Sequence, residues 1–135
     1  DVDNILDHRP LGIACAAAYT SDSGEVVKWY GKTQSGSPAQ KMSPTEAAIL
    51  VTDLQRRVSD GYTLATWNGL SFDFDILAEE SGARHQCIEL ALNHVDMMFH
   101  VVCSQGHYLS LQKAAVGMSL TGKLSGISGA DAPGM

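Results

Sequence analysis

Residues 66–77, TWNGLSFDFDIL, decide the fold of this 135-residue chain more than any other stretch. A run of strand-forming residues reaches Trp67, a tight turn follows at Asn68 and Gly69, and a helix then opens with Asp73 in its first turn. Open α/β sheets bind their ligands just beyond the carboxyl ends of the strands. The stretch therefore predicts an α/β domain with a carboxylate at a binding edge.

The spacing within this stretch predicts which side chains face the core. Residues four apart share one face of a helix, so Phe72 lies on the same face as Ile76, and Asp73 lies on the same face as Leu77. We expect Phe72, Ile76 and Leu77 to anchor the helix to the core. Asp75 lies on a different face, so Asp73 is the aspartate expected to face a cleft.

The pattern on both sides of this stretch predicts a sheet early in the chain and helices late. A turn signal at 21–24 joins two strand-like runs into a hairpin, and the first run is apolar on both faces, as in a strand covered on both sides. Ser43 to Glu46 form a capping box with proline at the first helical position. The expected strands are 10–20, 25–30 and 62–67, and the expected helices are 44–59, 71–80, 84–92, 97–102 and 110–116.

Composition limits the class of protein. The chain has 9 basic and 15 acidic residues, a net charge of −6, which argues against purely electrostatic binding of nucleic acid but not against an enzyme that uses metal ions. Three cysteines without a CxxC pair favour a reducing compartment and buried thiols, so we expect a cytoplasmic protein. No apolar run has the length of a membrane span.

We expect residues 1–135 to form a single domain in which the Gly/Ser-rich residues 117–135 are loop. The abrupt start at Asp1 and the loop-like end at 128–135 lead us to expect truncation at both ends. Asp96 precedes an apolar helical run and is expected to cap the helix that begins at Met97 rather than to bind metal.

A family resemblance follows from these residues. The pattern N-G-x-x-F-D-x-x-x-L, at Asn68, Gly69, Phe72, Asp73 and Leu77, resembles the second motif of the DEDD 3′-5′ exonucleases, which include polymerase proofreading domains. The order of elements from about 11 to 126 is similar as well. The resemblance implies a ribonuclease H-like fold, with an early antiparallel hairpin, a parallel strand and flanking helices, acting on the 3′ end of single-stranded DNA or RNA.

The resemblance also implies a site. Asp73 corresponds to the metal ligand of the second motif, and Asp1 and Asp3 are the candidates for the first motif, with Asp3 where the family has glutamate. Two Mg²⁺ or Mn²⁺ ions need several converging carboxylates to hydrolyse a phosphodiester. Asn68, Gly69 and Phe72 are the implied substrate-binding residues. The third acidic motif is not recognisable.

Two other functions remain open at this stage. The chain could be a non-catalytic ribonuclease H-like module with a binding or structural role, or an unrelated α/β domain that binds a small molecule beyond the sheet. A second carboxylate beside Asp73 distinguishes the nuclease from the module. A place within a larger polypeptide or a polymerase is also compatible with the resemblance.

Overall fold

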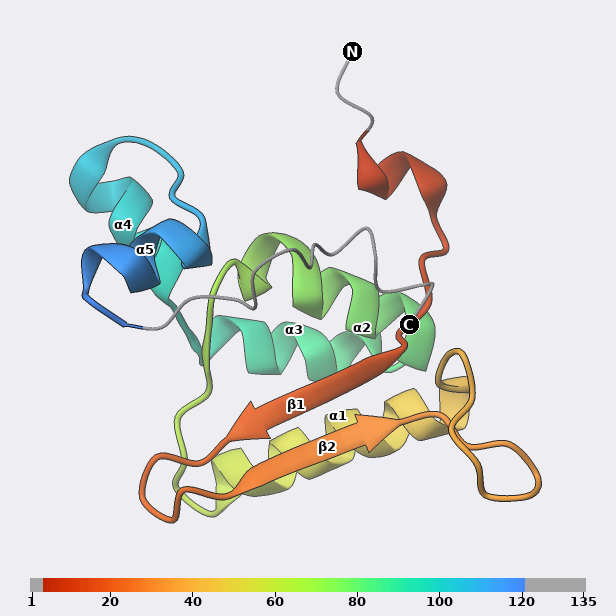
Figure 1. The fold of residues 1–135 in the computed structure, drawn as a ribbon. Helices are drawn as coiled ribbons and strands as arrows, with labels where there is room; N and C mark the ends of the chain where they lie inside the picture. The colour runs from red at the N-terminus through yellow and green to blue at the C-terminus, as the bar shows by residue number, and fades with distance from the viewer. Residues whose placement is uncertain (1–3, 121–135) are drawn as a thin grey trace.

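The computed structural model describes residues 4–120 as a mixed α/β fold. A short 3-10 helix, η1, precedes the first strand, and a π-helical turn, η2, precedes the second long helix (Figure 1). The elements in chain order are η1 (Ile5–His8), β1 (Cys15–Tyr19), β2 (Val26–Tyr30), α1 (Pro44–Ser59), β3 (Ala65–Thr66), η2 (Gly69–Asp73), α2 (Phe74–Ser81), α3 (Arg84–Leu92), β4 (Val95–Asp96), α4 (Met97–Gln105) and α5 (Leu111–Gly117).

The predicted hairpin is present, but its first strand is not covered on both faces. β1 pairs with β2 in antiparallel register. Ala16 and Ala18 pack against the core, whereas Cys15, Ala17 and Tyr19 are exposed. Alternate side chains of a strand point to opposite faces, and within residues 4–120 no layer covers the second face of β1. The small apolar side chains of this run therefore mark an open face rather than a buried strand.

Helix α1 follows its local sequence closely. The Ser43 side chain accepts a hydrogen bond from the Glu46 backbone N–H, and the Glu46 carboxylate accepts one from the Ser43 N–H, so the capping box is complete. This reciprocal pair satisfies two N–H groups that a helix start otherwise leaves unpaired. The inner face of α1 then buries Ala47, Leu50 and Val51.

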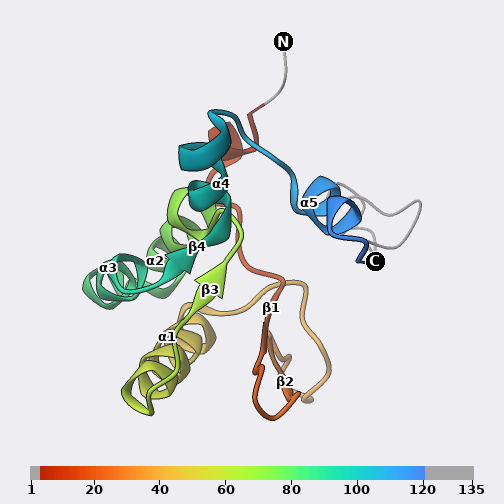
Figure 2. The same ribbon diagram turned by 90° about the vertical axis from the view of Figure 1, so that its left-hand side faces the viewer.

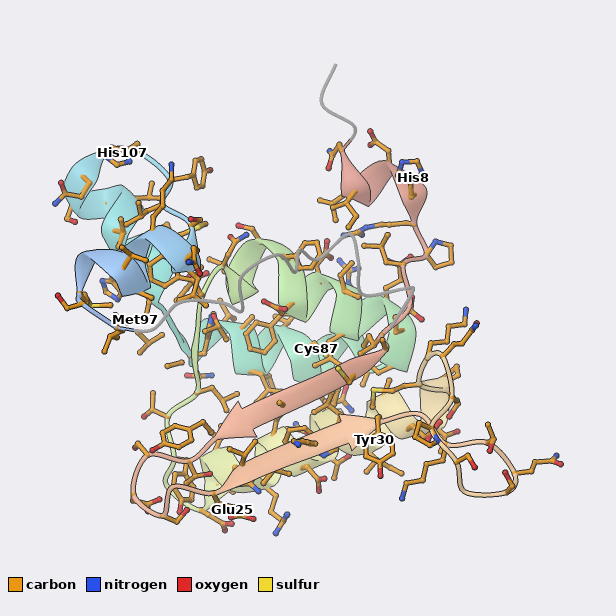
Figure 3. All side chains as sticks on the ribbon, viewed as in Figure 1. His8, Glu25, Tyr30, Cys87, Met97 and His107 are labelled. Atoms are coloured by element: carbon orange, nitrogen blue, oxygen red, sulfur yellow. The ribbon has the colours of Figure 1, made fainter. Side chains whose placement is uncertain are left out.

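The core lies between the hairpin and the first three long helices. Figure 2 shows α1, α2 and α3 on one side and β1 and β2 on the other. Full burial of each large aliphatic side chain here contributes roughly 1.5 to 3 kcal/mol. Cys87, labelled in Figure 3, is buried, as expected for the cysteines of this chain. Cys15 and Cys103 are exposed, so the expectation of buried thiols is wrong for these two. The central cluster consists of Trp29, Met42, Leu50, Val51, Phe74, Leu77, Cys87 and Leu90.

The second sheet has one strand that the sequence did not reveal. β3 is confined to Ala65–Thr66 within the expected 62–67 run, and it pairs in parallel with β4, where we had expected only a connection between helices. A strand of two residues is too short to produce an alternating pattern. Within residues 4–120 the antiparallel and parallel pairs form separate sheets, as Figure 2 shows.

Helices α4 and α5 lie apart from the core helices (Figure 1). The expected loop at 117–135 begins where α5 ends, at Gly117, and residues 121–135 lie outside the described residues. Among residues 4–120, none of the helices combines the length and the apolar character that crossing a bilayer requires.

Candidate functional site

Asp96, at the carboxyl end of β4, organises the edge of the parallel sheet. Its carboxylate is buried and accepts hydrogen bonds from the backbone N–H groups of Met98 at 3.1 Å and Phe99 at 3.3 Å, so it caps α4 as predicted. It also accepts from Asn68 at 2.9 Å and Leu70 at 3.1 Å, which belong to the turn after β3. One side chain thus joins the ends of both parallel strands.

These bonds keep Asp96 ionised. Burial by itself raises the pKa of a carboxyl group, but the four backbone donors stabilise the charged form more strongly, so the pKa of Asp96 lies below its usual value. Oδ1 accepts three of these bonds and Oδ2 accepts the fourth. Asp96 is therefore a structural anion whose lone pairs are directed at the backbone.

The turn held by Asp96 begins with Asn68 and Gly69. Asn68 adopts the left-handed conformation, with φ of 67°, which asparagine tolerates better than most residues. Gly69 is buried, and its N–H donates to Thr66 Oγ1 at 3.1 Å. A Cβ atom at position 69 would lie 2.4 Å from the same oxygen. Glycine at this position lets the backbone approach the end of β3 closely.

Gly69→Ala is therefore expected to destabilise the protein by about 1 to 3 kcal/mol, because the backbone must move away from Thr66. Urea denaturation followed by circular dichroism measures the loss. Gly117→Ala is the matched control, since a Cβ there meets no atom within 4 Å. An equal effect of the two substitutions would contradict the proposed close approach.

Asp73 lies at the end of η2, directly before α2. Asp73 occupies the N-cap position of α2, but its side chain makes no capping hydrogen bond, although a carboxylate at this position commonly does so. The residue is partly exposed to solvent and partly covered by the wall of a groove that runs between the two sheets. Burial beside this groove raises the pKa of Asp73, a bond to its own N–H opposes the rise, and the negative charge of Asp96 adds to it. The Asp73 carboxylate thus does not cap the helix that follows it.

The helix after Asp73 differs from the expected one. The chain makes a π-helical turn over Gly69–Asp73, and the α-helix begins only at Phe74. The wider turn changes which side chains face inward, so Phe74 is the buried aromatic residue and Phe72 is only half-buried. Ile76 and Leu77 are buried as expected. Phe72, predicted as a core anchor, is therefore not part of the buried core, and it lines the groove together with Asp73.

His94 is a site neighbour that sequence reasoning did not assign. Its Nε2 lies 3.1 Å from Thr66 Oγ1, the oxygen that also receives the Gly69 N–H. Its ring packs edge-on against Phe74 with centroids 4.6 Å apart. No local pattern marks this role, because the partners are brought together only by the β3–β4 pairing.

The described residues do not by themselves hold a two-ion centre. Within 4–120, no group of three or more His, Cys, Asp or Glu side chains is placed to bind a metal. Asp73 is a suitable oxygen ligand, but the oxygens of its neighbour Asp96 already accept backbone hydrogen bonds. The other predicted ligands, Asp1 and Asp3, lie outside the described residues.

In a comparison with protein families, residues 19–135 match the family RNase_H_2, described as RNase_H superfamily. The match begins at the last residue of β1, covers β2 to α5 and includes Asn68, Gly69, Phe72 and Asp73. Comparisons with curated proteins and with solved structures found no match.

Proposed function

The chain belongs to the RNase_H superfamily, and from this premise we propose that it is a metal-dependent 3′-5′ exonuclease domain acting on single-stranded DNA or RNA. Membership in the superfamily supports nucleic acid handling of the nuclease type. The 3′-5′ direction rests on the resemblance of residues 68–77 to the second exonuclease motif.

One observation carries the proposal: Asp73 is a partly desolvated carboxylate at the carboxyl edge of a parallel strand pair. Its pKa is raised by burial and by Asp96, so its ionised form lacks the stabilisation that a structural carboxylate obtains. A bound cation would stabilise such an ionised carboxylate strongly, because it offsets the burial and the neighbouring negative charge that disfavour ionisation. Perturbed acids of this kind concentrate at functional sites, which favours a ligand role over a capping role.

The remaining roles follow from the resemblance to the exonuclease motifs. We propose Asp1 and Asp3 as the further carboxylates that would join Asp73 around Mg²⁺ or Mn²⁺. We propose that Asn68, Gly69 and Phe72 receive the terminal nucleotide. Phe72 supports this because its half-buried ring lies in the groove wall that includes Asp73, and aromatic rings stack on terminal bases.

The direct test is degradation of a single-stranded oligonucleotide labelled at its 5′ end. With Mn²⁺ or Mg²⁺, we expect a ladder that shortens one nucleotide at a time from the 3′ end, and with EDTA we expect no products. An oligonucleotide with a blocked 3′ end is the matched control and should remain intact. Cleavage at internal positions, or from the 5′ end, would contradict the exonuclease assignment.

One observation supports a second candidate function: residues 4–120 contain no cluster of three or more potential metal ligands. This favours a non-catalytic module that binds nucleic acid without hydrolysing it. Fluorescence anisotropy with the same oligonucleotide separates the two. Binding that persists while Mn²⁺ gives no products would favour the module, whereas metal-dependent loss of the full-length oligonucleotide would favour the nuclease.

A further inference from the structure

His94 and Asp96 lie two residues apart on the segment that forms β4, so both side chains lie on the same face of the parallel sheet. Thr66 stands opposite Asp96 in the register of β3 and β4, which Figure 2 shows side by side. His94 is therefore a diagonal neighbour of Thr66 on that face. The strand pairing accounts for the 3.1 Å contact between the two side chains.

The hydrogen-bond partners of His94 determine the direction of each bond. Its Nδ1 atom faces the backbone carbonyl of Ala91, which can only accept, so Nδ1 carries the proton. In the neutral ring Nε2 then has the free lone pair and accepts from the Thr66 hydroxyl. Thr66 Oγ1 in turn receives the Gly69 N–H at 3.1 Å. An ordered series of bonds thus leads from His94 to the first residue of η2.

The same ring contacts the other end of the turn. Phe74 is the first residue of α2 and directly follows Asp73. Its buried ring lies edge-on against the ring of His94, with centroids 4.6 Å apart and an angle of 66° between the planes. Edge-on aromatic pairs at this separation are favourable beyond the area they bury. His94 therefore contacts both ends of the segment 66–74.

The position of Asp73 depends on this segment. Asp96 holds its middle through the N–H groups of Asn68 and Leu70. The Asp73 side chain makes no capping hydrogen bond of its own, so the backbone on either side determines where its carboxylate lies. Displacement of a reacting group by about 1 Å can cost on the order of a hundredfold in rate. Residues that fix the two ends of the turn therefore matter to any reaction at Asp73.

We propose that His94 is a positioning residue for the metal-dependent reaction. Through Thr66 at one end and Phe74 at the other, it holds residues 66–74 in the conformation that presents Asp73 at the groove. Both ring nitrogens have protein partners, so His94 acts through these contacts and not as a metal ligand or a general base. This inference rests on the proposed nuclease function, because it takes Asp73 to be a metal ligand.

Hydrogen exchange measured by NMR on the full 135-residue chain tests the positioning without any need for activity. His94→Asn keeps a donor near the position of Nδ1 but lacks the ring and cannot reach Thr66. The Gly69 N–H should exchange about tenfold faster in this variant, because its acceptor is no longer held in place. The buried Met98 N–H, which donates to Asp96, is the internal control and should not change. An unchanged Gly69, or equal acceleration at both amides, would overturn the proposal.

Nucleotide release tests the consequence for the reaction. His94→Asn should lower kcat/KM about tenfold or more, as loss of a residue that supports a metal ligand commonly does. His85→Asn is the matched control, because His85 is exposed and pairs only within its own helix with Glu89. Activity of His94→Asn equal to that of the control would overturn the positioning role.

The two proposals fail in different ways. A wild type that releases no nucleotide overturns the proposed function and with it the catalytic part of this inference, whereas the exchange of Gly69 still decides whether His94 holds the turn. Circular dichroism establishes that the variants fold. If His94→Asn does not fold, His94→Phe replaces it in both measurements, because it also lacks Nε2.

The Thr66 hydroxyl provides a test of the route. Thr66→Ser keeps the hydroxyl and should retain activity within about threefold, whereas Thr66→Val has nearly the same shape without it and should lose about tenfold or more. His94→Phe keeps an aromatic ring beside Phe74 and removes the bond to Thr66. Added to Thr66→Val, it should cost less than about twofold further, because the bond is already absent. Losses that multiply would show that His94 acts by another route, which would overturn the proposed series of bonds.

Discussion

Replacing Asp96 with alanine is expected to lower the free energy of unfolding by about 3 to 5 kcal/mol. The substitution leaves four backbone N–H groups, of Asn68, Leu70, Met98 and Phe99, without their acceptor. Each unsatisfied buried donor costs about 1 to 3 kcal/mol, and water recovers part of this at the more exposed positions. Urea denaturation followed by circular dichroism measures the difference.

Two further variants test this prediction. Asp96→Asn retains one acceptor oxygen but loses the charge, so its loss should be smaller than that of alanine. Asp60→Ala, at the exposed carboxyl end of α1, is the control and should change stability by less than about 0.5 kcal/mol. Comparable losses at positions 96 and 60 would contradict the anchoring role of Asp96.

The same residue predicts a pH dependence with a definite sign. The folded-state pKa of Asp96 lies below the unfolded value of about 3.9, so its stabilisation is fully present above pH 4. It is lost as the pH falls through the lower, folded-state pKa. The Asp96→Asn variant should therefore show a weaker loss of stability in acid than the wild type.

The sequence predicted the fold where local chemistry determines it. The helix at 44–59 depends on a capping box within four neighbouring residues, and the structure confirms it at both ends. The hairpin and the capping of α4 by Asp96 are confirmed for the same reason. Each of these features needs only residues that are close in the sequence.

Features that depend on distant residues could not be predicted. The β4 strand has two residues and exists only through its pairing with β3. The bonds from Asn68 and Leu70 to Asp96 join segments 28 and 26 residues apart. These bonds accompany the π-helical turn, after which Phe74 is buried in the core in place of Phe72, the residue expected there. The predicted residues Asn68 to Asp73 therefore lie at the end of β3, as the sequence suggests, whereas the packing around them could not be predicted.

Replacing Asp73 with asparagine is expected to reduce metal-dependent nucleotide release by on the order of a hundredfold or more. Loss of a metal ligand removes several kcal/mol of transition-state stabilisation, and about 1.4 kcal/mol corresponds to a factor of ten. Asp75→Asn is the matched control: Asp75 is two residues away, exposed, and paired with Arg9 and not with the groove. We expect the control to retain activity within about twofold.

Stability distinguishes a functional Asp73 from a structural one. Burial and the charge of Asp96 raise its folded-state pKa, so ionised Asp73 destabilises the fold, and wild-type stability should fall as the pH rises through that pKa. Asparagine is neutral at every pH, so Asp73→Asn should unfold at an equal or higher temperature than the wild type at pH 7 and should lack this dependence.

A cation bound at Asp73 would offset the charge, so Mn²⁺ should raise the melting temperature of the wild type but not of the variant. A variant that loses activity and stability together would instead mean that Asp73 supports the fold, because removal of a destabilising charge cannot by itself weaken it.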